Sequence, residues 1–155
     1  MILGIDPGPD LCGLVLYDPG PRRVVRSEKN IAVAGAIRDI DAAPAETLVA
    51  IERVQSYGIS GSSLLRTSES VGRLWAAAER SNMSLRLIYR REVLRALDIA
   101  GKGSRDALVR QRLIEMHGGT RSAAIGTKGA PGPLYGVASH AWAALAVAIV
   151  GWVER

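Results

Sequence analysis

Short apolar stretches separated by turn residues run through the first half of the chain and again near its middle. Residues 2–6, 13–18 and about 22–31 predict three antiparallel strands, with Asp18-Pro19-Gly20-Pro21 as one of the turns between them. Residues 47–54 and 85–90 form two more apolar stretches of strand length. The pattern therefore predicts five strands, the first three in a meander.

Longer segments between and after these stretches have the spacing of helices. Residues 60–82 predict a long helix in which Leu64, Val71, Leu74 and Ala78 lie near one face. The remaining segments predict a short helix within 33–45, helices near 91–99 and 104–117, a glycine-rich loop at 126–136 and a last helix over about 137–153. Helices that alternate with strands and then follow them predict a mixed α/β fold.

Composition narrows the class of protein. The chain has 155 residues, enough for one domain with a core, and contains no Phe. Cys12 is the single cysteine, which excludes an intrachain disulfide and a cysteine-cluster zinc site, and we expect it to be a small buried strand residue. The apolar run 141–153 is too short to span a bilayer, and Asp6 interrupts the first apolar run, so we expect no membrane segment, no signal peptide and a cytoplasmic location.

Two acids stand where apolar strands would otherwise continue. Asp6 follows Ile5, and Glu52 follows Ile51. Neighbouring carboxylates on adjacent strands repel each other and call for a cation, and oxygen ligands suit Mg²⁺ or Mn²⁺. Two such ions support phosphodiester hydrolysis. The alternative is that each acid pairs with an arginine or caps a turn, and the spacing alone leaves both interpretations open.

Three motifs carry a resemblance to a known family. "GIDPG" at 4–8 followed by Gly13, "AIERV" at 50–54 and "SHAWAALAVAI" at 139–149 resemble the RuvC-type Holliday junction resolvases of the RNase H-like superfamily in order and spacing. The resemblance implies an RNase H-like fold, a mixed five-stranded sheet flanked by helices, over 1–155 as a single nuclease domain. It also implies a homodimer, two Mg²⁺ per active site (or Mn²⁺), and paired nicks in a four-way DNA junction. The length resembles a phage or prophage form more than the bacterial housekeeping type.

The resemblance also assigns roles to individual residues. The first two family carboxylates correspond to Asp6, which would bridge two metal ions, and Glu52, which would hold one. The family's C-terminal pair corresponds to His140 and Ala143. A histidine at the first position can ligate metal or handle the attacking water. Ala143 departs from the pattern, which leaves open a lower metal affinity, a preference for Mn²⁺, an acid supplied from elsewhere, or an alanine introduced to silence the enzyme.

Asp106 is the candidate for such a compensating acid. It shares a helix face with Val109 and Leu113, so it can point inward. The alternative is local: Ser104 is a good N-cap, and an acid in the first turn favours the helix dipole.

Basic residues gather between 89 and 128, either as a solvated face or as a track for phosphates. The residues expected to contact DNA are Tyr57, which would stack on an opened base pair, and Lys102, Arg105, Arg110 and Lys128. The resemblance places dimer packing on the helix after Tyr57, where Leu64, Leu65 and Trp75 are candidates. Membership of the core is the default expectation for all three.

Three functions remain in view. The first is a metal-dependent junction endonuclease, and the second is an RNase H-like nuclease acting on RNA–DNA hybrid. The third is a protein that binds branched DNA with little or no cleavage, which Ala143 favours and the retention of Asp6 and Glu52 disfavours. An actin-like nucleotide-binding fold would need a second subdomain, for which 155 residues leave no room.

Overall fold

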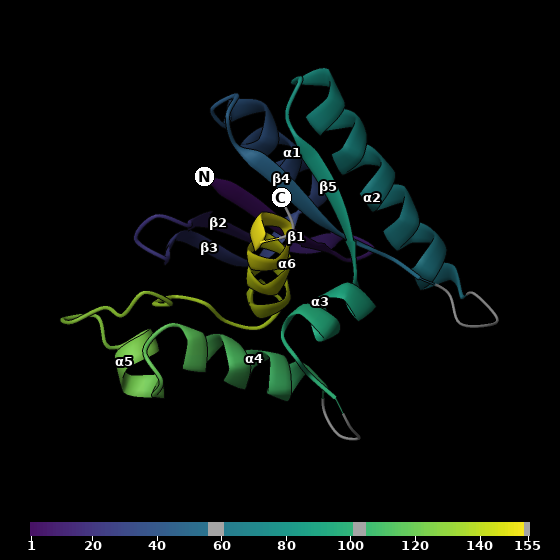
Figure 1. Ribbon diagram of the computed structural model, residues 1–155. Helices are drawn as coiled ribbons and strands as arrows, with labels where there is room; N and C mark the ends of the chain where they lie inside the picture. The colour runs from purple at the N-terminus through teal and green to yellow at the C-terminus, as the bar shows by residue number, and fades with distance from the viewer. Residues whose placement is uncertain (56–60, 101–104, 154–155) are drawn as a thin grey trace.

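The computed structural model describes residues 1–55, 61–100 and 105–153. Its centre is a five-stranded mixed sheet in the order β3-β2-β1-β4-β5 (Figure 1). The strands are β1 (Ile2–Pro7), β2 (Leu11–Asp18), β3 (Arg23–Ala32), β4 (Leu48–Arg53) and β5 (Leu85–Tyr89). β1 pairs antiparallel with β2, and β2 with β3, whereas β1, β4 and β5 run parallel. The predicted antiparallel meander and the five strands are confirmed.

Helices cover both faces of this sheet (Figure 1). They are α1 (Val33–Ala42), α2 (Ser62–Arg80), α3 (Arg90–Ala96), α4 (Arg105–Met116), α5 (Arg121–Ile125) and α6 (Ala141–Val153). One core cluster joins the sheet to α1 and α2, and a second joins the opposite face to α3, α4 and α6. The predicted arrangement, a sheet flanked by helices, is therefore confirmed.

The alternation of side chains along β1 decides which residues meet α6. Leu3 and Ile5 belong to the core under α1 and α2, so Gly4 and Asp6 face the other side. A Cβ built on Gly4 would lie 2.2 Å from the carbonyl oxygen of Ala144. On β2, a Cβ on Gly13 would lie 2.4 Å from the carbonyl oxygen of His140. Only glycine allows α6 to lie this close to the sheet.

The last helix begins later than its pattern predicts. The predicted start at about 137 is wrong, because α6 begins at Ala141 and Ser139 has a φ of +48°. The carbonyl of His140 accepts hydrogen bonds from the backbone N–H groups of Ala143 and Ala144. His140 therefore stands immediately before the helix rather than within it, where a turn aims its side chain.

Two further predictions need correction. The five-residue α5 was not expected from the pattern; Thr120 caps it by accepting a hydrogen bond from the backbone N–H of Ala123. The default that Leu65 and Trp75 belong to the core is wrong, because they are 60% and 39% exposed, whereas Leu64 is half-buried. Their place in a dimer interface stays a prediction. Cys12 is a buried free thiol, as expected.

A helix that spans a bilayer needs about 20 consecutive apolar residues. In the described ranges, every helix is too short or too polar to cross a bilayer.

Candidate active site

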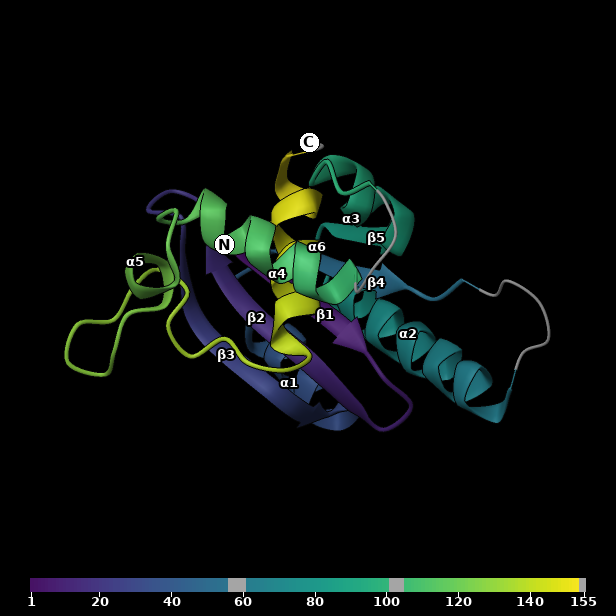
Figure 2. The ribbon, with the colours of Figure 1, turned by 90° about the horizontal axis from the view of Figure 1, so that it is seen from below.

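The two acids that interrupt the strands come together at one edge of the sheet. β1 and β4 are parallel neighbours in which Ile5 pairs with Ile51, so Asp6 and Glu52 occupy the next positions of the two strands. Both carboxylates line a cavity of about 410 Å³ whose wall also includes Asp106 and His140. Figure 2 shows the ends of β1 and β4 beside the starts of α4 and α6. The structure thus brings together all four residues predicted as catalytic.

His140 lies against Asp6 at the mouth of this cavity. Its Nδ1 is 3.3 Å from Oδ2 of Asp6, a hydrogen-bonding distance when Nδ1 carries the proton. The His140 side chain is 66% exposed, whereas that of Asp6 is only 18% exposed. Ala143 lines the same cavity but contributes no oxygen. The His140 imidazole is therefore accessible to solvent, and one of its two ring nitrogens contacts the largely buried carboxylate of Asp6.

Arg90 is a site residue that the sequence analysis did not single out. It begins α3 directly after β5 and lines the cavity, where it forms an ion pair with Asp106. Arg90 is 27% exposed and Asp106 is 89% exposed, so the arginine is the inner partner. The position of Arg90 directly after an apolar strand could have indicated this role. β5 runs parallel to β4, and the ends of parallel strands lie at the same edge of a sheet, so Arg90 comes close to Glu52.

Burial and mutual repulsion set the electrostatics of the acids. Burial raises the pKa of Asp6, while the nearby His140 and Arg90 oppose that rise. Burial, followed by the charge of Asp6, raises the pKa of Glu52 to about 7, and Arg90 again acts in the opposite direction. Among the described residues, no hydrogen bond or ion pair to a side chain or backbone group holds the Glu52 carboxylate. A cation between the two acids would relieve both effects.

These residues fit a divalent metal ion that prefers oxygen ligands. Mg²⁺ is commonly bound through one or two carboxylates, with water and substrate phosphates completing its shell. Asp6 and Glu52 provide such carboxylates in a shared cavity. In the described part of the chain, no three acidic, histidine or cysteine side chains come close enough to form a complete ligand cluster. The donor set therefore matches an open site finished by substrate oxygens rather than a closed protein cage.

The predicted DNA contacts fall in different places. The guanidinium of Arg110 lies 5.0 Å from the centre of the Trp142 ring, and Trp142 lines the cavity. Arg105 is exposed at the start of α4. Lys128 lies in the loop after α5, and Figure 2 shows α5 near the C-terminal end of α4, whereas Asp106, which lines the cavity, lies at the start of α4. Tyr57 and Lys102 lie outside the described residues, as does the proposed cap Ser104.

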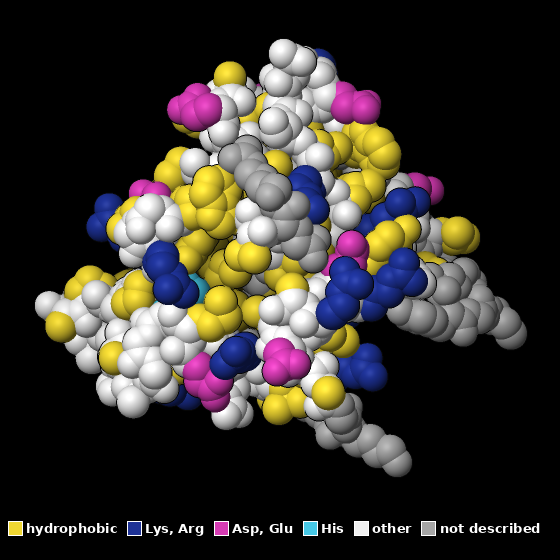
Figure 3. Space-filling view, in the orientation of Figure 1, with side chains coloured by type: hydrophobic (Ala, Val, Ile, Leu, Met, Phe, Trp, Pro, Cys, Tyr) yellow, Lys and Arg dark blue, Asp and Glu magenta, His cyan; other side chains and the backbone are white. Residues whose placement is uncertain are grey.

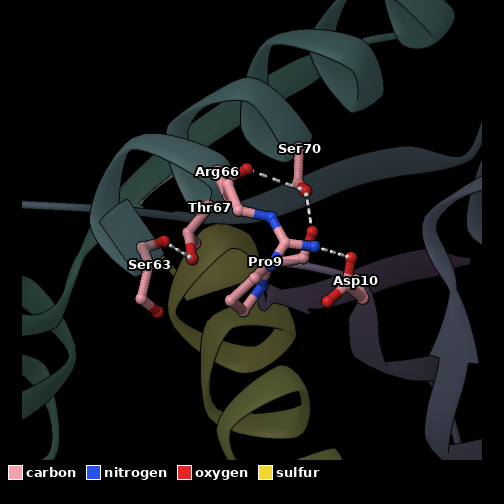
Figure 4. A network of polar contacts seen from close by, with 6 residues as sticks. All are labelled: Pro9, Asp10, Ser63, Arg66, Thr67 and Ser70. Carbon is pink, nitrogen blue, oxygen red and sulfur yellow. Dashed lines mark hydrogen bonds and ion pairs between the residues drawn. The ribbon is translucent and has the colours of Figure 1, made fainter. Parts of the chain in front are cut away.

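A polar network holds the turn that follows Asp6 (Figure 4). Arg66 of α2 forms an ion pair with the exposed Asp10. The hydroxyl of Ser70 lies 3.2 Å from the carbonyl oxygen of Pro9 and 3.2 Å from that of Arg66, so it can donate to either. These contacts tie α2 to the segment that carries Asp6.

The sheet order, the helices on both faces and the paired acids define a protein of the RNase H-like fold. Two solved structures of RuvC from Thermus thermophilus resemble it. RuvC in complex with Holliday junction substrate matches with a TM-score of 0.64 and 22% identity, over 99% of this chain and 94% of that chain. RuvC without a stated ligand matches with a TM-score of 0.62 and 19% identity, over 99% and 95%. The likeness confirms the predicted fold class. No protein-family profile and no curated protein sequence matches the chain.

Proposed function

We propose that this protein is a structure-selective endodeoxyribonuclease that resolves four-way (Holliday) DNA junctions by paired, metal-dependent phosphodiester hydrolysis. In this proposal the 155 residues act as one nuclease domain within a homodimer. The observation that carries it is that Asp6, Glu52 and His140 line one shared cavity. The RuvC structures, one of them in complex with Holliday junction substrate, support the choice of substrate.

Asp6 and Glu52 are the carboxylates that would hold Mg²⁺ or Mn²⁺, with two ions per active site, and His140 would either join them as a ligand when its exposed side chain moves or act on the attacking water. Bound there, such ions supply Lewis-acid stabilisation of the charge that develops on the phosphate. Asp6 lies between the other two residues, because it neighbours Glu52 across the strand pair and His140 across the cavity. Its Oδ2 faces His140, and its Oδ1 takes no part in that contact.

His140 has the geometry of a base for the attacking water. When Nδ1–H of His140 donates to Asp6, Nε2 is the ring nitrogen that faces away from this contact and can accept a proton from water or a bond to a metal ion. Because the side chain is exposed at the cavity mouth, water and phosphate reach it. Arg90, which lines the cavity, places a positive charge against the phosphate as negative charge builds on its oxygens.

Asp106 is the additional acid that takes the place of the one missing at Ala143. It lines the cavity from the first turn of α4 and is held there by Arg90. Its exposed carboxylate reaches the open side of the cavity, so it adds negative charge where Ala143 adds none.

A second candidate function is binding of branched DNA with little or no cleavage. Ala143 favours it, because that residue removes an oxygen ligand from the cavity wall. Cleavage of RNA–DNA hybrid is a third candidate that would use the same carboxylates.

Cleavage of a synthetic four-way DNA junction tests these alternatives, with linear duplex and RNA–DNA hybrid as parallel substrates. Reactions in Mg²⁺ and in Mn²⁺ would compare the wild type with Asp6→Asn, Ala143→Asp and the control Glu46→Gln, an exposed acid outside the cavity. Symmetric nicks in the junction, lost only in Asp6→Asn, are the expected result. Tight junction binding without cleavage in either metal would contradict it and support the second candidate. Preferential cleavage of the hybrid would support the third.

A further inference from the structure

Two hollows meet at the acids. The cavity of about 410 Å³ extends from Asp6 and Glu52 toward Trp142, between α4 and α6. A second hollow of about 250 Å³ extends from the same two acids toward Arg53 at the end of β4. Arg90 lines both. The acids therefore lie in the middle of a continuous groove and not at the bottom of a blind pocket.

Each end of this groove carries guanidinium groups supported by an aromatic ring. At one end Arg110 lies over the buried Trp142, 5.0 Å from the ring centre. At the other end Arg53 and Arg91 lie 5.1 Å and 4.8 Å from the centre of the Tyr89 ring. Figure 3 shows Lys and Arg side chains gathered near the ends of β4 and β5. A guanidinium already held on a ring loses less freedom when it binds a ligand.

Within the described part of the chain, the three ring-supported arginines lack the carboxylate partners that several other arginines of this molecule have. In the described residues, Arg53, Arg91 and Arg110 form no ion pair with a carboxylate, whereas Arg26 and Arg80 do. A guanidinium without a carboxylate partner has an uncompensated charge, and it can bind a phosphate through two parallel hydrogen bonds. Along the groove, positive charge lies at both ends and the two acids lie in the middle. This order matches a DNA strand in which the middle phosphate lies at the acids and the phosphates on either side lie at the arginines.

We propose that the DNA strand to be cut runs along this groove. Arg110 binds a phosphate on one side of the scissile phosphate, and Arg53 and Arg91 bind phosphates on the other side. The inference rests on the proposed nuclease function for the identity of the middle phosphate. The two arginine clusters fix the position of the strand, so that one phosphate is presented to Asp6 and Glu52.

Salt-dependent binding tests the proposal without requiring cleavage. Binding of the four-way junction and of a single DNA strand would be measured in EDTA for the wild type, Arg110→Gln and the double variant Arg53→Gln/Arg91→Gln. Arg121→Gln on α5 is the matched control, an exposed arginine away from the groove. The slope of log affinity against log salt should become shallower by about 1 in Arg110→Gln and by about 2 in the double variant. The control should keep the slope of the wild type.

Neutral linkages then locate each contact. Single methylphosphonate linkages would replace phosphates one at a time on both sides of the cleavage site. A neutral linkage on one side should weaken binding by the wild type but not by Arg110→Gln. A neutral linkage on the other side should weaken binding by the wild type and by Arg110→Gln, but should not change binding by the double variant. In Mg²⁺, both variants should raise KM more than they lower kcat, because the arginines hold flanking phosphates and do not contact the reacting one.

Several outcomes would overturn the proposal. The salt dependence of binding could be the same in Arg110→Gln and in the double variant as in the control Arg121→Gln. If the melting temperatures of these variants were also unchanged, the three arginines would not bind phosphates. Restoration of charge in Arg53→Lys/Arg91→Lys should recover the slope, and failure to do so would assign the loss to structure instead. Tighter arginine-dependent binding of an RNA strand than of DNA would also contradict it. If the wild type bound DNA through these arginines but did not cut it, the proposed nuclease function would be wrong, whereas the proposed binding of a DNA strand along the groove would be supported.

Discussion

Replacement of Glu52 by glutamine should stabilise the protein in the absence of metal. The carboxyl group of Glu52 is buried beside Asp6, and its pKa is raised from 4.5 to about 7. One pKa unit corresponds to about 1.4 kcal/mol, so ionised Glu52 destabilises the folded state by about 3 kcal/mol at pH 8. Glutamine has nearly the same shape and carries no charge. The free energy of unfolding of Glu52→Gln should therefore exceed that of the wild type by about this amount.

The pH dependence follows from the direction of the shift. Because the folded protein binds the Glu52 proton more tightly than the unfolded chain does, this contribution to stability is complete below the unfolded pKa of 4.5. It is lost as the pH rises to about 7, the folded pKa. At pH 5 the advantage of Glu52→Gln over the wild type should fall below about 1 kcal/mol.

Urea unfolding with EDTA, followed at pH 5 and pH 8, measures both values. Glu69→Gln, an exposed glutamate on α2, is the matched control and should unfold like the wild type at either pH. Addition of Mg²⁺ at pH 8 should then stabilise the wild type more than Glu52→Gln, because binding to the folded state alone raises its stability. Equal stabilities of Glu52→Gln and the wild type at pH 8 in EDTA would refute the claim that burial and repulsion strain this carboxylate.

Three further outcomes are expected. Gly13→Ala should destabilise the protein by about 1–3 kcal/mol in thermal unfolding, because the added Cβ meets the His140 backbone. Gly72→Ala in α2 is the matched control, because the space around Gly72 is open, and it should stabilise the protein by about 1 kcal/mol. Junction cleavage at limiting Mg²⁺ should rise as the pH increases through about 7, since the Glu52 proton competes with the cation; a rate independent of pH would contradict this. Arg90→Met should move that midpoint to higher pH, because Arg90 lowers the pKa of Glu52.

The sequence alone determined the strands and the paired acids. The apolar stretches separated by turn residues predict all five strands, since strand formation follows local periodicity. Asp6 and Glu52 stand out because a carboxylate within a buried strand is costly without a partner. The motifs around Asp6, Glu52 and His140 also led to the RNase H-like fold, which the RuvC structures confirm.

The tertiary structure decided the rest of the site. Arg90 looks like one of many basic residues in the sequence, and only the parallel pairing of β4 with β5 brings it to the acids. The residue before α6 packs closely on Gly13 of β2, and this contact between distant segments brings His140 to Asp6. The support of Arg53 by Tyr89 likewise joins two strands that are distant in the chain. Local patterns record the conformation of neighbouring residues, whereas the charge and contacts of an active site depend on segments that meet only when the sheet forms.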